Sequence, residues 1–254
     1  MATNIADLFH KYFEMVPATT AELKESAFRI RYEVYCLENS FEDPRSFPDG
    51  MEKDEYDAHS EHCLILHRET NLFAATARLI LPDPNDLDSC FPTERHCLIE
   101  RADLLQGIPR PHMAEISRLC VSSHFKRRKY ESYSSLGIAH KNYYPTPLDY
   151  DKNRRILPNF TLALFSCLLR MSAQHGITCW YALMENQVAR LFRTLGINFV
   201  PIGPTVEYRG QRKPYFIKVA DLLAGVKCKD LSAWELLSNY GEYPQDGEHA
   251  DGAK

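Results

Sequence analysis

The chain has 254 residues, of which 44% are apolar and 25% are charged, and its formal net charge at pH 7 is −4. This composition is typical of a globular protein, and the length suits one large domain. The nearly neutral charge argues against a general nucleic-acid binder, because such proteins present strongly basic surfaces. No apolar run reaches the roughly 20 residues that cross a bilayer, and the N-terminus lacks the apolar core of a signal peptide.

The eight cysteines contain no C-x-x-C pair, and several of them lie inside apolar runs, as Cys63 and Cys167 do. Buried free thiols are typical of proteins in a reducing compartment. The sequence therefore predicts a cytoplasmic protein with neither disulfides nor a metal site.

The first 57 residues predict two helices, a strand and a long loop. Apolar residues at 5, 8, 9, 12 and 13 indicate a helix, although 13–18 could instead be a first strand, and the boundary between the two stays open. Thr19 and Glu22 have the spacing of a capping box, which opens a second helix with Ala27 and Val34 on its apolar stripe. Residues 41–57 contain proline and glycine without any periodicity, which predicts a loop longer than most connections.

The rest of the chain predicts a sheet with a few helices. Loops are expected at 82–95 and 208–213, and Gly176 and Gly196 are expected to end two helices. The predicted strands are 62–67, 72–81, 113–122, 177–184, 199–202 and 215–219, and the predicted helices are 157–175, 186–195 and 230–239.

These elements together predict the α/β class with a mixed sheet. We expect one domain over residues 1–240, with an irregular insertion at about 124–156. Residues 241–254 carry four acids against one lysine and predict a disordered tail.

The segment 51–57, M-E-K-D-E-Y-D, has four acids among its seven residues. Such a group repels itself unless cations or hydrogen-bond donors hold it. A solvated acidic loop is the ordinary interpretation. We interpret it instead as half of an active site, with Asp54 and Asp57 facing the site and Lys53 and Glu55 facing solvent. The side of Glu52 stays open.

An ordered set of motifs accompanies this segment. R-Y-E-V-Y spans 31–35, Phe41 follows it, and Arg78, Phe91 and E-I-S-R at 115–118 come after E-K-D-E-Y-D. In this order the set resembles the acyl-homoserine lactone synthase family. It resembles more closely the PEP-CTERM/exosortase system-associated acyltransferases and the long-chain N-acyl amino acid synthases. All are branches of the GNAT acyltransferase superfamily, and the resemblance covers about residues 10–220.

The resemblance implies a GNAT-like, three-layer α/β/α fold and a site for amide formation from an acyl thioester. It implies that the charged and aromatic residues of the site are Arg31, Tyr35, Phe41, Asp54, Asp57, Arg78, Glu115 and Arg118, and we add Ser117 as a substrate-binding residue. Tyr35 stands where lactone synthases usually have Phe, and Phe41 where they have Trp. Both differences point away from a lactone-type amine.

The chemistry requires a base, because only a neutral amine can attack the thioester. Glu115 is the first candidate and Asp54 the second, with Arg118 beside them. Backbone N–H groups along 115–121 are candidates to stabilise the oxyanion. The three arginines could pair with the acids as part of the chemistry, or only as a structural ion-pair network.

The acyl donor is inferred from the residues after Val121. They read S-S-H-F-K-R-R-K and lack the glycines that let a backbone wrap the diphosphate of CoA. We therefore expect an acyl carrier protein, with acyl-CoA as the other candidate and no bound cofactor. The predicted docking residues are Lys126, Arg127, Arg128, Lys129, Arg154 and Arg155. A solvated loop and a peripheral contact with anionic lipid are the alternatives.

An acyl chain also needs an apolar tunnel. The apolar residues of the helix at 157–175 and of the next strand could line one, but at this spacing a plain core is the favoured interpretation. These residues are Phe160, Leu164, Phe165, Leu168 and Trp180.

The resulting hypothesis is an N-acyltransferase that moves a fatty acyl chain from an acyl carrier protein, or from acyl-CoA, to a small amine. An amino acid is the favoured acceptor, and nucleic acid is not an expected partner. One alternative is a lactone synthase that uses S-adenosylmethionine. Another is an acyl-binding protein without catalytic activity.

Overall fold

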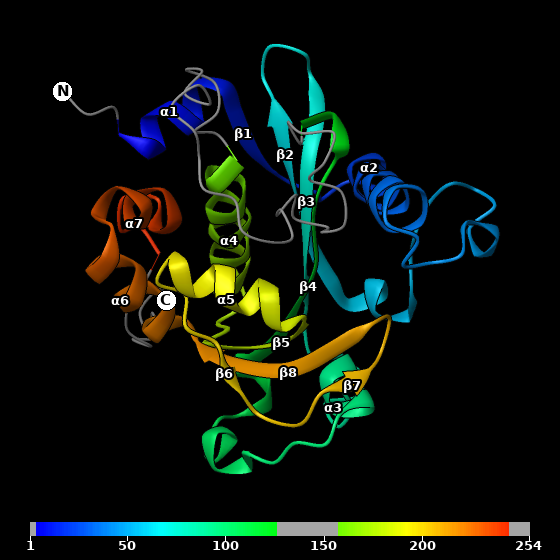
Figure 1. The fold of residues 1–254 in the computed structure, drawn as a ribbon, viewed down its shortest axis with the longest axis vertical. Helices are drawn as coiled ribbons and strands as arrows, with labels where there is room; N and C mark the ends of the chain where they lie inside the picture. Colours follow the sequence, from blue (N-terminus) through cyan, green and yellow to red (C-terminus); the bar gives the residue numbers. More distant parts are fainter. Residues whose placement is uncertain (1–3, 126–156, 244–254) are drawn as a thin grey trace, which may run out of the picture. The chain divides into compact units, whose positions relative to one another are not determined.

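A computed structural model describes residues 4–125 and 157–243 of the chain (Figure 1). The chain forms two compact units, and each is assembled from several segments. Unit 1 comprises Met1–Asp57, Glu61–Arg78 and Arg118–Cys167, and unit 2 comprises Ala58–Ser60, Leu79–Ser117 and Leu168–Lys254. The predicted insertion and acidic tail lie mostly outside the described residues.

Unit 1 is built from N-terminal helices and strands. Its elements are α1 (Ile5–Tyr12), β1 (Phe13–Pro17), α2 (Ala21–Tyr32), a π-helix (Glu33–Glu38), most of β2 (Ser60–His67) and β3 (Leu72–Ile80), the end of β4 (Met113–Val121) and the start of α4 (Leu157–Gln174). β1 and β2 pair antiparallel, with Phe13 opposite His67 and Pro17 opposite Cys63.

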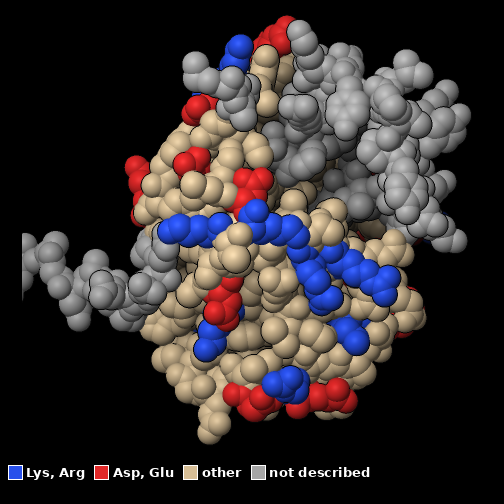
Figure 2. Space-filling view, turned by 60° about the vertical axis from the view of Figure 1, so that its left-hand side comes forward, with Lys and Arg blue, Asp and Glu red and all other residues tan. Residues whose placement is uncertain are grey.

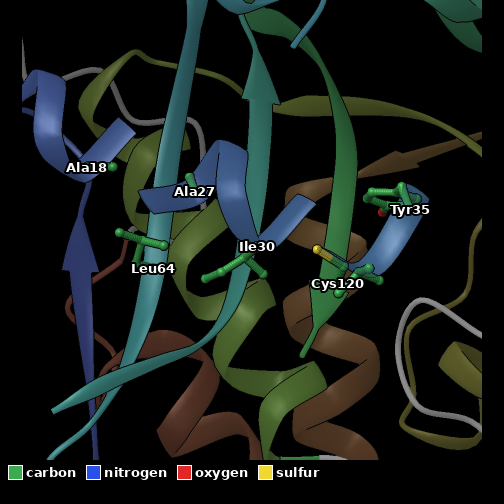
Figure 3. Packing of buried hydrophobic residues seen from close by; sticks show 7 residues of the cluster. Ala18, Ala27, Ile30, Tyr35, Leu64 and Cys120 are labelled. Atoms are coloured by element: carbon green, nitrogen blue, oxygen red, sulfur yellow. The ribbon is translucent and has the colours of Figure 1, made fainter. Parts of the chain in front are cut away.

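A helix packs on each face of the strands of unit 1. Successive residues of a strand point to opposite faces, so neighbouring residues of β2 contact different helices. Leu64 on β2 packs against Ala27 and Ile30 of α2 (Figure 3). Its neighbour Cys63 points the other way, where its thiol contacts Cys167 of α4. Within unit 1 these contacts produce a helix–sheet–helix sandwich of the predicted three-layer kind.

Unit 2 contains the C-terminal strands and helices. Its elements are α3 (Pro92–His96), the first part of β4, the end of α4, β5 (Cys179–Met184), α5 (Asn186–Thr194), β6 (Val200–Pro201), β7 (Val206–Glu207), β8 (Gln211–Lys218), α6 (Val219–Lys229) and α7 (Leu231–Ser238). β8 pairs antiparallel with β5, β6 and β7.

The strands belong to one eight-stranded mixed sheet, which confirms the predicted α/β class. Its order is β1-β2-β3-β4-β5-β8-β6, with β7 paired to β8. β4 and β5 run parallel, and their paired residues end at Ile116 opposite Ala182. Two residues later, Arg118 adopts a left-handed conformation with φ of 52°. A non-glycine residue in this region inside a strand breaks the regular pleat and redirects its side chain.

Most predicted elements are confirmed, and the exceptions have physical causes. The N-cap of α2 is Thr20 and not Thr19, because the Thr20 hydroxyl accepts the N–H of Leu23 while Thr19 N–H bonds Pro17 O. α6 was not predicted, since Gly225 weakens the helical pattern. The glycine is required there because a Cβ would collide with the backbone carbonyl of Gly196.

Two further differences concern loops. The expected loop at 82–95 contains α3, which Pro92 begins. The expected turn at 208–213 is shorter, because β8 already starts at Gln211. None of the helices described for residues 4–125 and 157–243 has both the length and the apolar composition needed to cross a bilayer.

The five candidate tunnel residues are all buried, which agrees with their core interpretation. Phe160 packs edge-on against Phe13 in unit 1, with ring centroids 4.7 Å apart. Trp180 in unit 2 donates its indole N–H to Ser172 Oγ at 2.8 Å, which satisfies its polar atom inside the core.

Candidate active site

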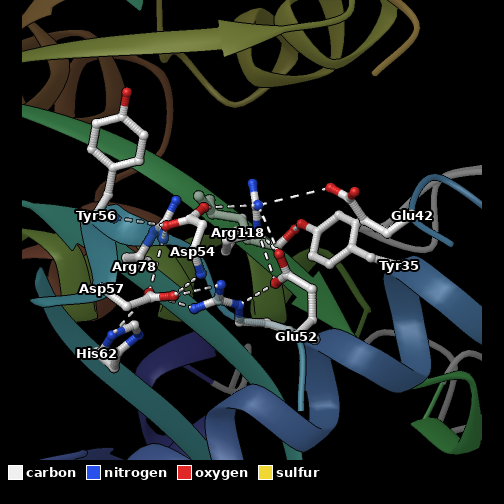
Figure 4. A network of polar contacts seen from close by, with 11 residues as sticks. Tyr35, Glu42, Glu52, Asp54, Tyr56, Asp57, His62, Arg78 and Arg118 are labelled. Carbon is white, nitrogen blue, oxygen red and sulfur yellow. Dashed lines mark hydrogen bonds and ion pairs between the residues drawn. The ribbon is translucent and has the colours of Figure 1, made fainter. Parts of the chain in front are cut away.

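Three arginines and three acids interlock in unit 1 (Figure 4). Arg31 comes from α2, Arg78 from β3 and Arg118 from β4, while the acids come from the loop before β2. We call this group the charge cluster, and its members are Arg31, Glu52, Asp54, Asp57, Arg78 and Arg118.

Arg31 is the innermost member, with a side chain that is 0% exposed. Its Nε donates to Glu52 Oε2 at 2.6 Å, and its two terminal nitrogens grip Asp57 at 2.7 and 3.0 Å. Its guanidinium carbon also lies 5.1 Å from the centre of the Phe28 ring. A buried guanidinium is stable only with such complete pairing.

Asp54 and Asp57 share Arg78, and the loop backbone completes their contacts. Arg78 Nη1 lies 2.5 Å from Asp54 Oδ1 and 2.8 Å from Asp57 Oδ1. Asp54 N–H donates to Asp57 Oδ2 at 2.8 Å, and Glu52 N–H donates to Phe28 O at 3.1 Å. The acidic segment is therefore tied to α2 and β3 by both side chains and backbone.

Arg118 joins the acids from the end of β4. Its guanidinium donates to Glu52 Oε1 at 2.8 Å and to Asp54 Oδ2 at 3.0 Å, and Glu42 Oε1 lies 3.9 Å away. Its guanidinium carbon is 5.5 Å from the Tyr35 ring centre. These contacts hold the left-handed backbone of Arg118, a conformation that persists only where its surroundings fix it.

The aromatic residues of the predicted set lie next to Arg118. The Tyr35 hydroxyl donates to the carbonyl of Leu119 at 3.3 Å, so it anchors the π-helix to β4. The ring of Phe41 is tilted against that of Tyr35, with centroids 6.2 Å apart.

The three acids stay ionised despite their burial. Burial raises the pKa of Glu52, but the charges and hydrogen bonds of Arg118 and Arg31 outweigh it and hold the pKa well below its ordinary value. Arg31 and Arg78 lower the pKa of Asp57 in the same way. For Asp54 the opposing charges that lower the pKa are Arg78 and Arg118.

Exposure separates an inner and an outer part of the charge cluster. The side chains of Arg31, Glu52 and Arg78 are at most 1% exposed. Asp54 is 13% exposed and Arg118 is 11% exposed, and Asp57 is intermediate at 8%. A small molecule that approaches the cluster can therefore touch Asp54 and Arg118, while the inner residues hold them in place.

His62 on β2 lies behind Asp57. Its ring is buried, its Nε2 is 3.4 Å from Asp57 Oδ1, and neither ring nitrogen has a hydrogen-bond partner among the described residues. Burial and the nearby charge of Arg31 lower the pKa of His62 to about 3. It is therefore neutral inside the folded protein at physiological pH.

Glu115 and Ser117 of the predicted set belong to the part of β4 in unit 2. Glu115 is 2% exposed, and its Oε2 accepts the backbone N–H of Thr93 at 2.8 Å. The carboxylate contributes, after burial, to raising the pKa of the Cys97 thiol to about 11.

The sequence therefore identified five of the six members of the charge cluster and left the orientation of the sixth, Glu52, undecided. Arg31, Asp54, Asp57, Arg78 and Arg118 lie together as expected, and Lys53 and Glu55 are exposed as expected. Glu52, whose side was undecided, bridges Arg31 and Arg118. Its backbone bond to α2, which no sequence pattern reveals, is what turns it inward.

His62 and Phe28 were not predicted, because only their spatial neighbours mark them. The predicted docking residues, Lys126–Lys129 with Arg154 and Arg155, lie outside the described residues. Over the described ranges, no group of three or more His, Cys, Asp and Glu side chains is arranged to hold a metal ion.

Comparison with known proteins agrees with this fold. Residues 30–135, which include the whole charge cluster and Glu115, match the acetyltransferase (GNAT) domain family. No curated protein matches the sequence.

Several solved structures share the fold. The AHL synthase LasI is 18% identical over 84% of this chain and 95% of its own, with a TM-score of 0.52. The CoA-dependent acyl-homoserine lactone synthase BjaI, solved with SAM and isopentyl-CoA, is 17% identical over 92% and 90%, with a TM-score of 0.52. FeeM, an N-acyl amino acid synthase from uncultured soil microbes, is 13% identical over 85% and 96%, with a TM-score of 0.51.

At these identities the similarity establishes a GNAT-like fold. The matched domain and the fold together support an acyltransferase enzyme.

The buried neutral His62 predicts a pH-dependent stability. Its pKa is about 3 when folded and about 6.5 when unfolded, so the unfolded chain binds the extra proton first as the pH falls. This contribution is complete above pH 6.5 and is lost progressively below it. We expect it to lower the free energy of unfolding by about 2 kcal/mol between pH 7 and pH 5.

Urea unfolding of wild type and His62→Phe at the two pH values measures this contribution. The variant should lose about 2 kcal/mol less than wild type over this range. The exposed His175, changed to Gln, is the control and should leave the pH dependence as it is. An unchanged pH dependence in His62→Phe would contradict the assignment.

Proposed function

We propose that this protein is an N-acyltransferase that transfers a fatty acyl chain from a thioester to the amine of a small molecule. The observation that carries the proposal is the placement of a buried carboxylate, Glu115, on β4 at the point where the β4–β5 ladder ends. Glu115, the proposed base, is still paired with Tyr181, and the pairing of the two strands ends one residue later at Ile116 opposite Ala182.

Glu115 is the stronger of the two candidate bases. Asp54 accepts hydrogen bonds from Arg78, Arg118 and the Tyr56 N–H, and its pKa is lowered. A carboxylate held so firmly in its ionised form is a weak proton acceptor. Asp54 is better suited to an electrostatic role within the charge cluster.

In the proposed reaction the acceptor amine loses a proton to Glu115 and attacks the thioester carbonyl. The carbon–sulfur bond breaks, an amide forms, and the donor leaves as a free thiol. Arg31 and Arg78 have structural roles, since both are buried in ion pairs, while Arg118 is one of the more exposed members of the charge cluster.

The favoured acceptor is an amino acid or a related amine. The similarity in fold to an N-acyl amino acid synthase supports this choice. A lactone synthase that consumes S-adenosylmethionine is the second candidate, because two of the similar structures are such synthases by name. The association with PEP-CTERM/exosortase systems is a proposal that rests on the sequence motifs alone. A cytoplasmic location fits the eight free cysteines.

An acyl carrier protein is the proposed donor, and acyl-CoA is the other candidate. The residues after β4 contain none of the glycines that would cradle the CoA diphosphate. Residues 185–218 carry six basic residues and two acidic ones, in a chain whose net charge is −4. The basic residues are Arg190, Arg193, Arg209, Arg212, Lys213 and Lys218.

This basic segment follows β5 directly and forms α5 and the β7–β8 hairpin. Arg190 and Arg193 are exposed one turn apart on α5, and Lys229 of α6 lies beside them, 3.5 Å from the Arg193 carbonyl. Figure 2 shows a band of Lys and Arg side chains across one face of the protein. This face includes the side on which Figure 1 shows α5 and α6. Such a surface suits an acidic carrier protein.

The activity is tested by incubating the purified protein with an acyl carrier protein thioester and a mixture of amino acids, and by measuring thiol release. We expect turnover with wild type and a fall of about 10²–10⁴-fold in Glu115→Gln, because a general base contributes that much. The exposed Glu100, changed to Gln, is the control. Absence of thiol release from wild type with both acyl carrier protein and acyl-CoA thioesters would overturn the proposal.

The products separate the alternatives in the same assay. Methylthioadenosine released from S-adenosylmethionine identifies a lactone synthase. A lipid retained by the purified protein without any turnover identifies a binding protein.

Charge reversal on α5 tests the donor. Arg190→Glu with Arg193→Glu should raise KM for the acyl carrier protein thioester about 10-fold or more, since the two charges guide encounter with an acidic partner. KM for the same acyl group on free pantetheine should stay constant. Arg29→Glu, an exposed reversal on α2, is the matched control. Equal effects on both donors, or none, would argue against docking at this surface.

A further inference from the structure

Arg110 is a partly buried residue that the proposed reaction has not used. It lies in the short 3₁₀ turn Arg110–His112 just before β4. Its Nη1 donates to both oxygens of Glu94 at 2.7 and 2.8 Å, and its Nη2 donates to the Ser89 carbonyl. Its guanidinium carbon lies 4.0 Å from the centre of the Phe91 ring, a close cation–π distance.

Glu94 uses this pairing to shape the start of α3. Its Oε2 also accepts the Phe91 N–H at 2.9 Å, which closes the first turn of the helix. The Tyr181 hydroxyl is hydrogen-bonded to the same carboxylate, and burial followed by the Glu94 charge raises the pKa of Tyr181. Glu94 is therefore fixed by a backbone N–H, a guanidinium and a phenol.

The same turn of α3 holds Glu115. Thr93 lies between Phe91 and Glu94, and its backbone N–H donates to Glu115 Oε2 at 2.8 Å. Thr93 is 0% exposed, so water does not compete for this contact. The position of the Thr93 N–H depends on the turn that Glu94 closes, and the position of Glu94 depends on Arg110.

A second contact joins this assembly to the sheet. Tyr181 on β5 is the register partner of Glu115 on β4, and its ring packs edge-on against Phe91 at 5.9 Å. Phe91 thus contacts both the ring of Tyr181 and the guanidinium of Arg110. All of these residues belong to unit 2.

We infer that Arg110 is a positioning residue for Glu115, acting through Glu94 and the Thr93 N–H. The inference rests on the proposed role of Glu115 as the base. A hydrogen bond to a carboxylate favours its ionised form, so the bond from Thr93 is one contact that governs how readily Glu115 accepts a proton. Arg110 fixes this bond without touching the substrate.

Arg110→Lys is the decisive variant, because lysine keeps the charge but cannot form the bidentate pair or stack on Phe91. When the Thr93 bond loosens, the pKa of Glu115 rises, and the acidic limb of the rate profile moves to higher pH by about one unit. We expect kcat to fall about 10-fold at pH values on the acidic limb, where one pKa unit is a tenfold change in the ionised fraction, with KM for the donor unchanged.

Three further variants control for indirect effects. Arg101→Lys alters a similar Arg–Asp pair, with Asp103, that is exposed and should change neither kcat nor the pH profile. Glu94→Gln breaks the charged pair from its other side and should shift the same limb, which keeps the test valid if Arg110→Lys folds poorly. Adding Arg110→Lys to Glu115→Gln should cause no additional loss of rate.

The outcomes separate this inference from the proposed function. If Glu115→Gln is inactive while Arg110→Lys and Glu94→Gln keep the wild-type kcat and pH profile, the positioning role is wrong and the base assignment stands. If Glu115→Gln retains full activity, the base assignment itself fails. A parallel loss of rate at every pH, without movement of the acidic limb, would also contradict the inference.

Discussion

The pairing of Arg31 with Glu52 and Asp57 is the interaction on which the candidate site depends. A guanidinium that is 0% exposed has exchanged water for protein acceptors, and loss of either acid would leave this buried charge only partly compensated. The two acids come from a loop that has little regular structure of its own. Arg31 therefore holds the 41–57 loop, which would otherwise be solvated, in a fixed position at the candidate site.

Arg78 and Arg118 continue these ion pairs toward the protein surface. Arg78 and Arg118 bring the number of guanidinium groups in the charge cluster to that of its carboxylates, so the cluster is balanced before any substrate arrives. Its most exposed members are Asp54 and Arg118. The strained backbone of Arg118 and the end of the β4–β5 ladder occur within two residues of each other, so β4 supplies both the irregular strand and the candidate base.

The sequence predicted the elements with a regular period and the residues of a matched motif. It did not predict features that arise from contacts across the chain. The inward turn of Glu52 depends on a backbone bond to Phe28, and the buried His62 is recognised only by its neighbours Asp57 and Phe28. Helix α6 escaped prediction because Gly225, which disfavours helix locally, is needed for close packing against Gly196. Arg110 lies outside every motif, and its proposed effect on Glu115 passes through residues of α3.

Hydrogen exchange of the 41–57 loop tests most directly whether Arg31 holds it. In Arg31→Ala the amides of Glu52 and Asp54, which bond Phe28 O and Asp57, should exchange on the order of a hundredfold faster than in wild type. Arg45→Ala, which removes an exposed pair from the same loop, should leave them unchanged. Wild-type exchange at both amides in a folded Arg31→Ala protein would contradict the account.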